Sequence, residues 1–182
     1  MAGPFRIRAA AAPDIPALEV LIAASVNGLQ AADYSPEQRT GALEAVFTVD
    51  TQLIADQTYF VVEDGAGKMV ACGGWSKRKT LFGGDRADVR EPELLDPLTD
   101  NARIRAFFVH PDWARQGIGT LLLEACESAA QAAGFRHFEM GATLTGERLY
   151  RLRGYTAVER IEVPLPNGAL LPVIRMRKDA EP

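Results

Sequence analysis

The second half of the chain carries a strand, helix, strand pattern that restricts the possible folds. Arg103 to Val109 predicts one strand, and Arg136 to Gly141 predicts another. Between them, Gly117 to Ala133 predicts a helix with an apolar stripe, and Gly134 is suited to end it. Because the joints are short, the two strands must be parallel and linked by a right-handed crossover.

The other predicted strands are connected differently. They span Phe5 to Ala9, Tyr59 to Glu63, Met69 to Trp75, Val158 to Val163 and Leu170 to Met176. The second and third form a hairpin around Asp64-Gly65-Ala66-Gly67, and the last two are joined around Pro166-Asn167-Gly168. Hairpin strands are antiparallel, whereas the crossover strands are parallel. We therefore predict a mixed α/β fold with a central mixed sheet.

Three further helices are predicted outside the crossover. One opens at Pro13-Asp14-Ile15-Pro16 and is expected to be broken by Asn27-Gly28. A second begins after Ser35, a capping residue that is followed by proline. A short third helix covers Thr145 to Arg153 and is stopped by the glycine that follows it. Since no inter-domain linker is visible, residues 1–182 are predicted to form a single domain.

Length and composition narrow the class of protein. The chain has 182 residues, of which 47% are hydrophobic, as in ordinary globular proteins of one domain. Its net charge of -4 provides no positive field, which argues against nucleic-acid and membrane partners. Two cysteines and a start without a secretory signal favour a cytoplasmic location. Arginine outnumbers lysine by 16 to 4, a composition associated with GC-rich bacterial genomes.

A long segment without regular periodicity separates the two halves of the chain. Ser76 to Asn101 is rich in Gly, Pro, Asp and Arg, and it predicts a long loop. Loops of this length in a compact domain are usually functional or disordered. This loop either covers a binding site or is a solvated insertion, and both alternatives stay open. Its basic run Ser76-Lys77-Arg78-Lys79 fits solvated charge better than a phosphate clamp.

Two glycines at the start of the crossover helix suggest a place for an anion. Gly117 and Gly119 lack side chains where a ligand would approach the backbone, and no Ser, Thr, Asp or Asn immediately precedes Gly117 as a helix cap. A phosphate would satisfy the free N–H groups. Alternatively, the glycines only permit tight packing of the helix against the sheet.

Two other phosphate-binding motifs do not match. A Walker loop needs Gly-Lys followed by Ser or Thr, but Gly67-Lys68 is followed by Met69 in a hairpin turn. A dinucleotide fingerprint needs a third glycine at the place of Leu122. Neither a nucleotide hydrolase nor a dinucleotide-binding protein is therefore predicted.

Together with its flanks, the glycine pair resembles motif A of the GNAT superfamily of acyl-CoA N-acyltransferases. Residues 107–119 read Phe-Phe-Val-His-Pro-Asp-Trp-Ala-Arg-Gln-Gly-Ile-Gly, with the strand, Val-x-Pro, aromatic and glycine positions of that motif. Residues 149–155, Leu-Tyr-Arg-Leu-Arg-Gly-Tyr, resemble motif B of the same superfamily. The order of the predicted elements agrees as well, so the resemblance covers essentially the whole chain.

The resemblance implies an acyl-CoA site between splayed parallel strands that are flanked by helices. The implied cofactor-binding residues are Phe107, Phe108, Val109, Arg115, Gln116, Gly117, Ile118, Gly119, Thr120 and Thr143. The first three would pair with the pantetheine arm through their backbone, and N–H groups of residues 115–120 would hold the pyrophosphate. Thr143 replaces the Asn of many members, and Ala114 replaces their Arg or Gln. These departures weaken side-chain contacts but keep the backbone contacts.

Tyr150 is the implied catalytic residue. It lies where the family places the phenol that hydrogen-bonds the CoA sulfur and protonates it as it leaves. The chemistry needs such a donor, because a thiolate that leaves near neutral pH is helped by a positioned proton. The alternative interpretation is an aromatic side chain of the core.

Two arginines occupy the strand on which some family members carry their general base. Arg103 lies where those members have Glu, so a carboxylate base on this strand is not expected. Because side chains alternate along a strand, Arg103 and Arg105 share a face, and two guanidiniums suit a carboxylate or phosphate on the acceptor. Alternatively, one arginine pairs with Glu139 on the neighbouring strand and is structural.

These features predict an acetyl-CoA-dependent N-acetyltransferase that acts on the primary amine of a small molecule in a ternary complex. The alternative is a non-catalytic acyl-CoA-binding or regulatory module. No metal site is expected, because His110 and His137 are the only histidines and no Cys or His pair has ligand spacing. The family often dimerises, so a homodimer is a further expectation. The acceptor, the acyl group, the general base and the oligomeric state stay open, and the acceptor pocket is expected from residues 26–46 and 76–101.

Overall fold

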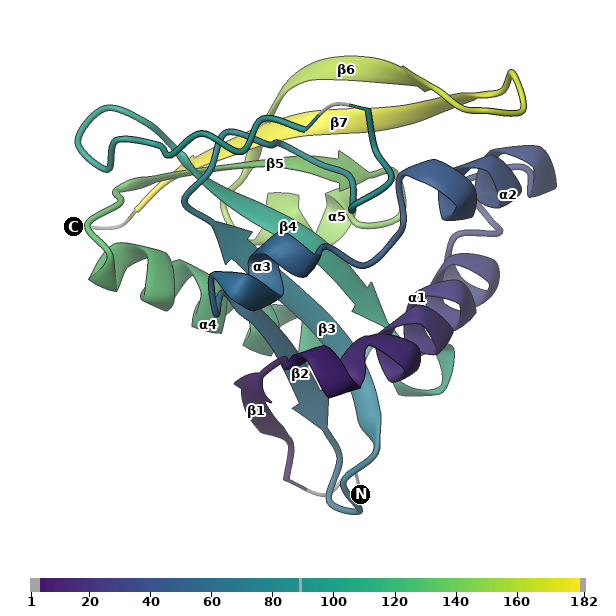
Figure 1. The fold of residues 1–182 in the computed structure, drawn as a ribbon, viewed down its shortest axis with the longest axis horizontal. Coiled ribbons are helices and arrows are strands. Elements are labelled where there is room, and N and C mark those ends of the chain that lie inside the picture. Colours follow the sequence, from purple (N-terminus) through teal and green to yellow (C-terminus); the bar gives the residue numbers. More distant parts are fainter. Residues whose placement is uncertain (1–3, 89, 181–182) are drawn as a thin grey trace.

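A seven-stranded mixed sheet forms the centre of the structure, a computed structural model that describes residues 4–88 and 90–180 (Figure 1). Its strands are β1 (Arg6–Ala9), β2 (Tyr59–Glu63), β3 (Met69–Ser76), β4 (Ala102–Val109), β5 (His137–Thr143), β6 (Thr156–Pro164) and β7 (Leu170–Asp179). Their order across the sheet is β1-β2-β3-β4-β5-β7-β6. β4 and β5 are parallel, and the other neighbouring pairs are antiparallel. The predicted mixed sheet with a parallel central pair is confirmed.

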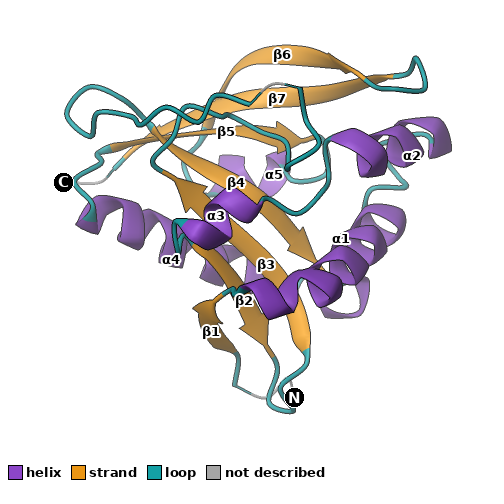
Figure 2. Cartoon of the chain, viewed as in Figure 1, coloured by secondary structure: helices purple, strands orange, loops and turns teal. Residues whose placement is uncertain are grey.

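Helices cover both faces of this sheet. They are α1 (Ile15–Leu29), α2 (Pro36–Ala45), α3 (Thr51–Ala55), α4 (Ile118–Ala132) and α5 (Glu147–Leu152), with 3₁₀ turns at Ala12–Asp14 and Pro111–Trp113. α1 and α3 lie on one face, and α4 and α5 lie on the other (Figure 2). Leu18 and Ile22 of α1 and Leu122 of α4 are buried against the strands. Each such side chain contributes about 1.5–3 kcal/mol by leaving water.

β4 and β5 diverge soon after they meet. Their pairing is limited to Ala102 opposite Phe138 and Arg103 opposite Glu139, and beyond these pairs β5 continues along β7 (Figure 1). The edge of β4 that faces β5 is therefore open after Arg103. This geometry confirms the splayed central strands that the family resemblance implies.

The expected break at Asn27-Gly28 is wrong. α1 continues through both residues to Leu29, and the N–H of Gln30 still donates to the carbonyl of Val26. The glycine has a different purpose, because a Cβ at Gly28 would come within 2.3 Å of the Pro111 side chain. Gly28 therefore lets α1 approach the loop that follows β4.

The short helix α3 was not predicted from the sequence. Asp50 caps it by accepting a hydrogen bond of 3.0 Å from the N–H of Gln52. A single helical turn such as α3 is too short to show helical periodicity.

The predicted start of α2 is confirmed, because the Ser35 hydroxyl accepts a hydrogen bond from the N–H of Gln38 and the Gln38 side chain accepts one from the N–H of Ser35.

The long loop between β3 and β4 folds back on itself. Its two arms are joined by backbone hydrogen bonds from Leu95 to Lys77, from Lys79 to Glu93 and from Thr80 to Glu91. Their lengths are 2.8, 3.0 and 3.0 Å. Backbone hydrogen bonds between the described residues of the two arms thus hold the loop together (Figure 1).

A buried ion pair attaches this loop to the sheet. The Asp50 carboxylate lies 2.8 Å from the Arg105 guanidinium on β4 and 3.0 Å from the Arg90 guanidinium on the loop. Both arginines also donate to the carbonyl of Gly83. Asp50 and Arg105 are 1% and 3% exposed, so water cannot replace either partner.

We expect Asp50→Asn to lower the free energy of unfolding by about 3–5 kcal/mol, because it leaves the Arg105 charge buried with no counterion. Asparagine can still cap α3, so the loss isolates the charge. Urea denaturation measures the effect. The matched variant Asp179→Asn removes a carboxylate whose side chain is 85% exposed beside His137, and it should cost no more than about 1 kcal/mol. Equal stability of Asp50→Asn and the wild type would contradict a role for this pair.

Candidate active site

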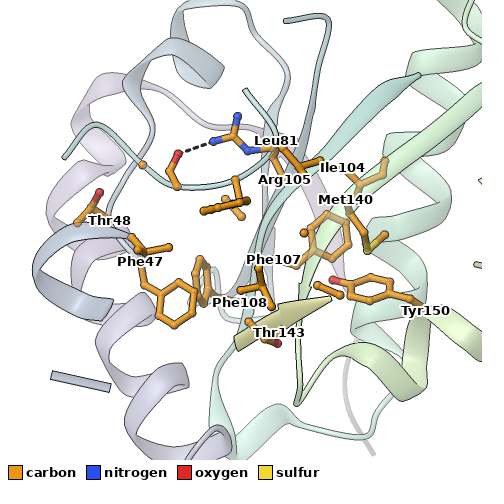
Figure 3. Close-up of a pocket in the computed structure, with 18 residues that line it drawn as sticks. Phe47, Thr48, Leu81, Ile104, Arg105, Phe107, Phe108, Met140, Thr143 and Tyr150 are labelled. Atoms are coloured by element: carbon orange, nitrogen blue, oxygen red, sulfur yellow. Dashed lines mark hydrogen bonds between the residues drawn. The ribbon is translucent and has the colours of Figure 1, made fainter. Parts of the chain in front are cut away.

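A small cavity of about 70 Å³ opens where β4 and β5 separate (Figure 3). It is lined by residues 46–48, 81–84, 104–108 and 140–143, together with Tyr150 and Val173. β4 and β5 supply two of its walls, and the segment after α2 and the long loop supply the others. The prediction that the long loop covers a binding site is therefore consistent with the position of its residues 81–84.

Tyr150 reaches this cavity from α5. Its ring is 8% exposed and packs edge-on against Phe107 and Tyr155, with ring centroids 6.3 and 6.0 Å apart. Its hydroxyl points toward the centre of the lining residues (Figure 3). Burial raises the pKa of Tyr150 above its ordinary value, so the phenol stays protonated at neutral pH. A protonated hydroxyl in this position can donate a hydrogen bond or a proton.

A β-bulge shapes the β4 wall of the cavity. The register shifts so that Gly73 of β3 lies between the pairs Cys72–Phe108 and Gly74–Arg105, opposite two residues of β4. Ala106, one of those two, has a φ of 56°, which is unusual for a residue with a side chain. The extra residue changes the alternation of side chains. Phe107 consequently packs against Tyr150, whereas Phe108 packs against Phe47 on the other face, 5.7 Å away between centroids.

The start of α4 offers free N–H groups to an anion. Its N-cap, Gly117, has a φ of 82° and no side chain caps the helix. The first intrahelical bond runs from Leu121 to Gly117, which leaves the N–H groups of residues 118–120 without an internal partner. Arg115 also has a positive φ of 59°, so the backbone curls before the helix begins. Such consecutive N–H groups at the positive end of a helix fit a phosphate.

The two glycines of the motif differ in their surroundings. A Cβ at Gly117 would meet nothing within 4 Å, so this glycine faces open space. A Cβ at Gly119 would come within 2.9 Å of the Leu149 side chain, so this glycine permits α4 to approach α5. Ile118 between them is 1% exposed and is available through its backbone alone, while Arg115 and Gln116 are exposed. Close packing thus accounts for Gly119, and access for a ligand accounts for Gly117.

The arginines of β4 are both paired with carboxylates. Arg103 lies 3.2 Å from Glu139 and donates to the carbonyls of Lys79 and Asn101. This is the structural pairing that the sequence left open as an alternative. Arg105 pairs with Asp50, and of the two arginines it is the one that lines the cavity.

The remaining predicted residues divide into two groups. Phe107, Phe108 and Thr143 line the cavity, and the Thr143 hydroxyl also accepts a hydrogen bond of 3.0 Å from the N–H of Gly146 before α5. Val109 and Thr120 lie outside the cavity lining, toward the start of α4. Phe107, Phe108 and Thr143 thus lie around one cavity with Tyr150. The residues expected to bind the pyrophosphate, 115–120, lie outside the cavity lining at the start of α4.

No motif singled out several of the lining residues. Leu81 and Phe82 lie within residues 76–101, one of the two segments from which the acceptor pocket was expected, and Phe47 and Thr48 directly follow the other, residues 26–46. Leu81-Phe82 and Leu94-Leu95 are apolar pairs in a polar loop, and such pairs were the available signal that parts of the loop pack against the rest of the protein. None of the lining residues is Asp or Glu.

Among the described residues, no group of three or more His, Cys, Asp or Glu side chains is arranged to hold a metal ion. No helix in the described part of the chain is both long and apolar enough to cross a membrane.

Comparison with solved structures identifies close similarities in fold. A GCN5-related N-acetyltransferase from Rhodopseudomonas palustris superposes with a TM-score of 0.72 at 22% identity, over 98% of both chains. The PaiA N-acetyltransferase from Thermoplasma acidophilum, solved with coenzyme A, gives 0.65 at 11% identity over 97% and 99% of the two chains. YncA from Salmonella typhimurium, solved with its cofactor acetyl-CoA, gives 0.64 at 17% identity over 99% and 96%.

A family model supplies the assignment that fold similarity alone does not. No curated protein sequence matches the chain. The model of the acetyltransferase (GNAT) domain matches residues 55–157, which include β4, the start of α4 and Tyr150. Since this match spans more than half of the chain and contains the β4 and β5 walls of the cavity as well as the free helix start, the chain belongs to the GNAT family of acetyltransferases, a family of acyltransferases.

Proposed function

We propose that the chain is a single-domain, cytoplasmic N-acetyltransferase that transfers the acetyl group of acetyl-CoA to the primary amine of a small molecule. The observation that carries the proposal is the Tyr150 hydroxyl, which points into the cavity between the separated strands β4 and β5 (Figure 3). The free N–H groups at the start of α4 support it, because they provide a place for the pyrophosphate at the other end of the cofactor.

The chain's own backbone would bind most of acetyl-CoA. The open edge of β4 at residues 107–109 has lost β5 as a neighbour, so it can pair with the amide groups of pantetheine as with an added strand. N–H groups of residues 115–120 would bind the pyrophosphate, and Thr143 on β5 faces the same cavity. Bound in this way, the thioester would lie near Tyr150.

The reaction is a direct acyl transfer. The amine nitrogen attacks the thioester carbonyl carbon, the carbon–sulfur bond breaks, and Tyr150 donates its proton to the leaving sulfur. The amine arrives neutral or first loses a proton to water. After attack its nitrogen releases a second proton to water, since no carboxylate lines the cavity, and the Tyr150 phenolate regains a proton from solvent. Orientation of the two reactants contributes up to roughly 7–11 kcal/mol at the ideal limit, and general acid catalysis contributes about 10²- to 10⁴-fold.

The acceptor side of the cavity combines an apolar lining with an excess of positive charge. Phe47, Leu81 and Phe82 lie on this side. Arg90 and Arg105 share one carboxylate, that of Asp50, so this group of three side chains keeps one positive charge. An acceptor with a carboxylate and an apolar side chain would therefore be favoured over a dication.

Thiol release from acetyl-CoA with a panel of amines tests the function and the acceptor class. Apolar amino acids should be acetylated with a kcat/KM at least fivefold above that of their amides, because only the acids carry a negative charge toward Arg105. Arg105→Gln should raise KM for the acids alone, whereas Arg103→Gln, outside the cavity lining, should not. Acyl-CoA binding without turnover by any amine would instead indicate a non-catalytic module.

A charge substitution at Gly117 tests the phosphate site. Asn and Asp have the same shape and both tolerate positive φ, and a Cβ at this position meets no neighbour within 4 Å. Gly117→Asp should weaken acetyl-CoA binding at least tenfold relative to Gly117→Asn, about 1.4 kcal/mol, because its carboxylate competes with phosphate for the same N–H groups. Isothermal titration calorimetry measures both dissociation constants. Equal affinities would contradict a phosphate site at the start of α4 and leave Gly117 with its positive φ alone.

Removal of one hydroxyl tests the general acid. Tyr150→Phe keeps the edge-on packing against Phe107, so acetyl-CoA should bind normally while kcat falls by about 10²-fold or more. Tyr155→Phe is the matched control, because its hydroxyl donates to Glu127 at 2.8 Å and not into the cavity. The assignment is wrong if Tyr150→Phe turns over as fast as this control.

A further inference from the structure

Two buried polar side chains meet at the β-bulge without a role in the proposed chemistry. The Tyr59 hydroxyl of β2 lies 3.2 Å from the carbonyl oxygen of Ala106 and 3.1 Å from the Cys72 sulfur of β3. The Cys72 sulfur lies 3.9 Å from the same carbonyl oxygen. Both side chains are fully buried, at 0% exposure. A phenol in the core normally requires a hydrogen-bond partner, and here the O–H of Tyr59 has two acceptors, the carbonyl of the bulge and the Cys72 sulfur.

The bulge needs such support. Ala106 adopts a left-handed conformation that residues with a side chain avoid, so surrounding contacts must maintain it. Gly73 supplies the space, because a Cβ there would come within 2.5 Å of the Phe107 ring. Tyr59 and Cys72 supply the polar contacts. Cys72 and Gly73 therefore have separate tasks: Cys72 contacts the carbonyl of the bulge, and Gly73 leaves space for the Phe107 ring.

The orientation of this carbonyl determines what the bulge presents to the cavity. In a trans peptide the N–H of Phe107 points opposite to the carbonyl of Ala106, and the described residues contain no cis peptide. The carbonyl points toward Tyr59 and Cys72, on the face that α1 covers. The N–H of Phe107 must therefore point to the other side of β4, where β5 has separated and Tyr150 lies.

We infer that Tyr59, together with Cys72, is a positioning residue for acyl transfer: by holding the Ala106 carbonyl it fixes the bulge, and with it the Phe107 backbone and ring beside Tyr150. This inference rests on the proposed function. Neither side chain touches the cavity, so both act through β4. Burial raises the pKa of Tyr59 and raises that of Cys72 to about 12, so both groups stay protonated and can donate at neutral pH.

Tyr59→Phe is the direct test. It deletes the hydroxyl, keeps the ring, and should lower kcat about tenfold, while the dissociation constant of acetyl-CoA stays within twofold of the wild type. The N–H of Phe107 should exchange with deuterium at least tenfold faster, as NMR can measure. Tyr155→Phe is again the matched control, because it deletes another buried hydroxyl, which donates to Glu127 at 2.8 Å outside the cavity lining. This control should lose stability without the selective loss of kcat.

A conservative series at Cys72 keeps the inference testable if Tyr59→Phe does not fold. Cys72→Ser retains a donor beside the Ala106 carbonyl and should keep kcat within twofold, whereas Cys72→Ala should lower it at least threefold. Equal kcat values for these two variants, or a folded Tyr59→Phe with wild-type kcat, would overturn the positioning role. Unchanged exchange at Phe107 in Tyr59→Phe would overturn it as well.

Hydrogen exchange separates this inference from the proposed function. If the wild type transfers acetyl to no amine, the proposed function fails. The exchange rate of the Phe107 N–H in Tyr59→Phe still decides whether the hydroxyl fixes the bulge. If exchange accelerates but kcat of an active enzyme does not change, the proposed function stands and the positioning role is overturned.

Discussion

The separation of β4 from β5 is the constraint on which the rest of the site depends. Two parallel strands that paired along their whole length would satisfy each other's N–H and carbonyl groups and leave no room for a ligand. Here pairing ends at Arg103, and β7 takes over the other edge of β5. The backbone of β4 beyond that point is left open, and the cavity with Tyr150 occupies the gap. The backbone groups of β4 beyond Arg103 therefore have no neighbouring strand on the β5 side and are available to a ligand.

Buried polar groups maintain the two walls that this separation leaves unsupported. Asp50 holds the loop wall by binding Arg105 and Arg90, and Tyr59 contacts the carbonyl of the bulge on the strand wall. Both interactions lie in the apolar interior, where an unpaired polar group is costly and a paired one is directional. These directional contacts act on Arg105 and Ala106, two residues that line the cavity.

Elements that depend on neighbouring residues were predicted correctly from the sequence, whereas features that depend on residues far apart in the chain were not. The strand at Tyr59–Glu63 and the cap at Ser35 are decided by neighbouring residues, and both were predicted. The reason for a glycine at position 28 lies far along the chain, in the close approach of Pro111, and the prediction that Asn27-Gly28 breaks the helix was wrong. Helix α3 was missed because a single turn has no period to detect.

The sequence by itself determined the mixed α/β class, the parallel crossover, the free helix start at Gly117 and the position of Tyr150 in a family motif, because each is encoded in a short stretch of neighbouring residues. The tertiary structure alone decided which contacts between distant segments support the cavity. Asp50 and Arg105 are 55 positions apart, and Tyr59 and Ala106 are 47 positions apart. Contacts over such distances arise from the register of the strands and from the path of a loop, and neither leaves a local pattern in the sequence.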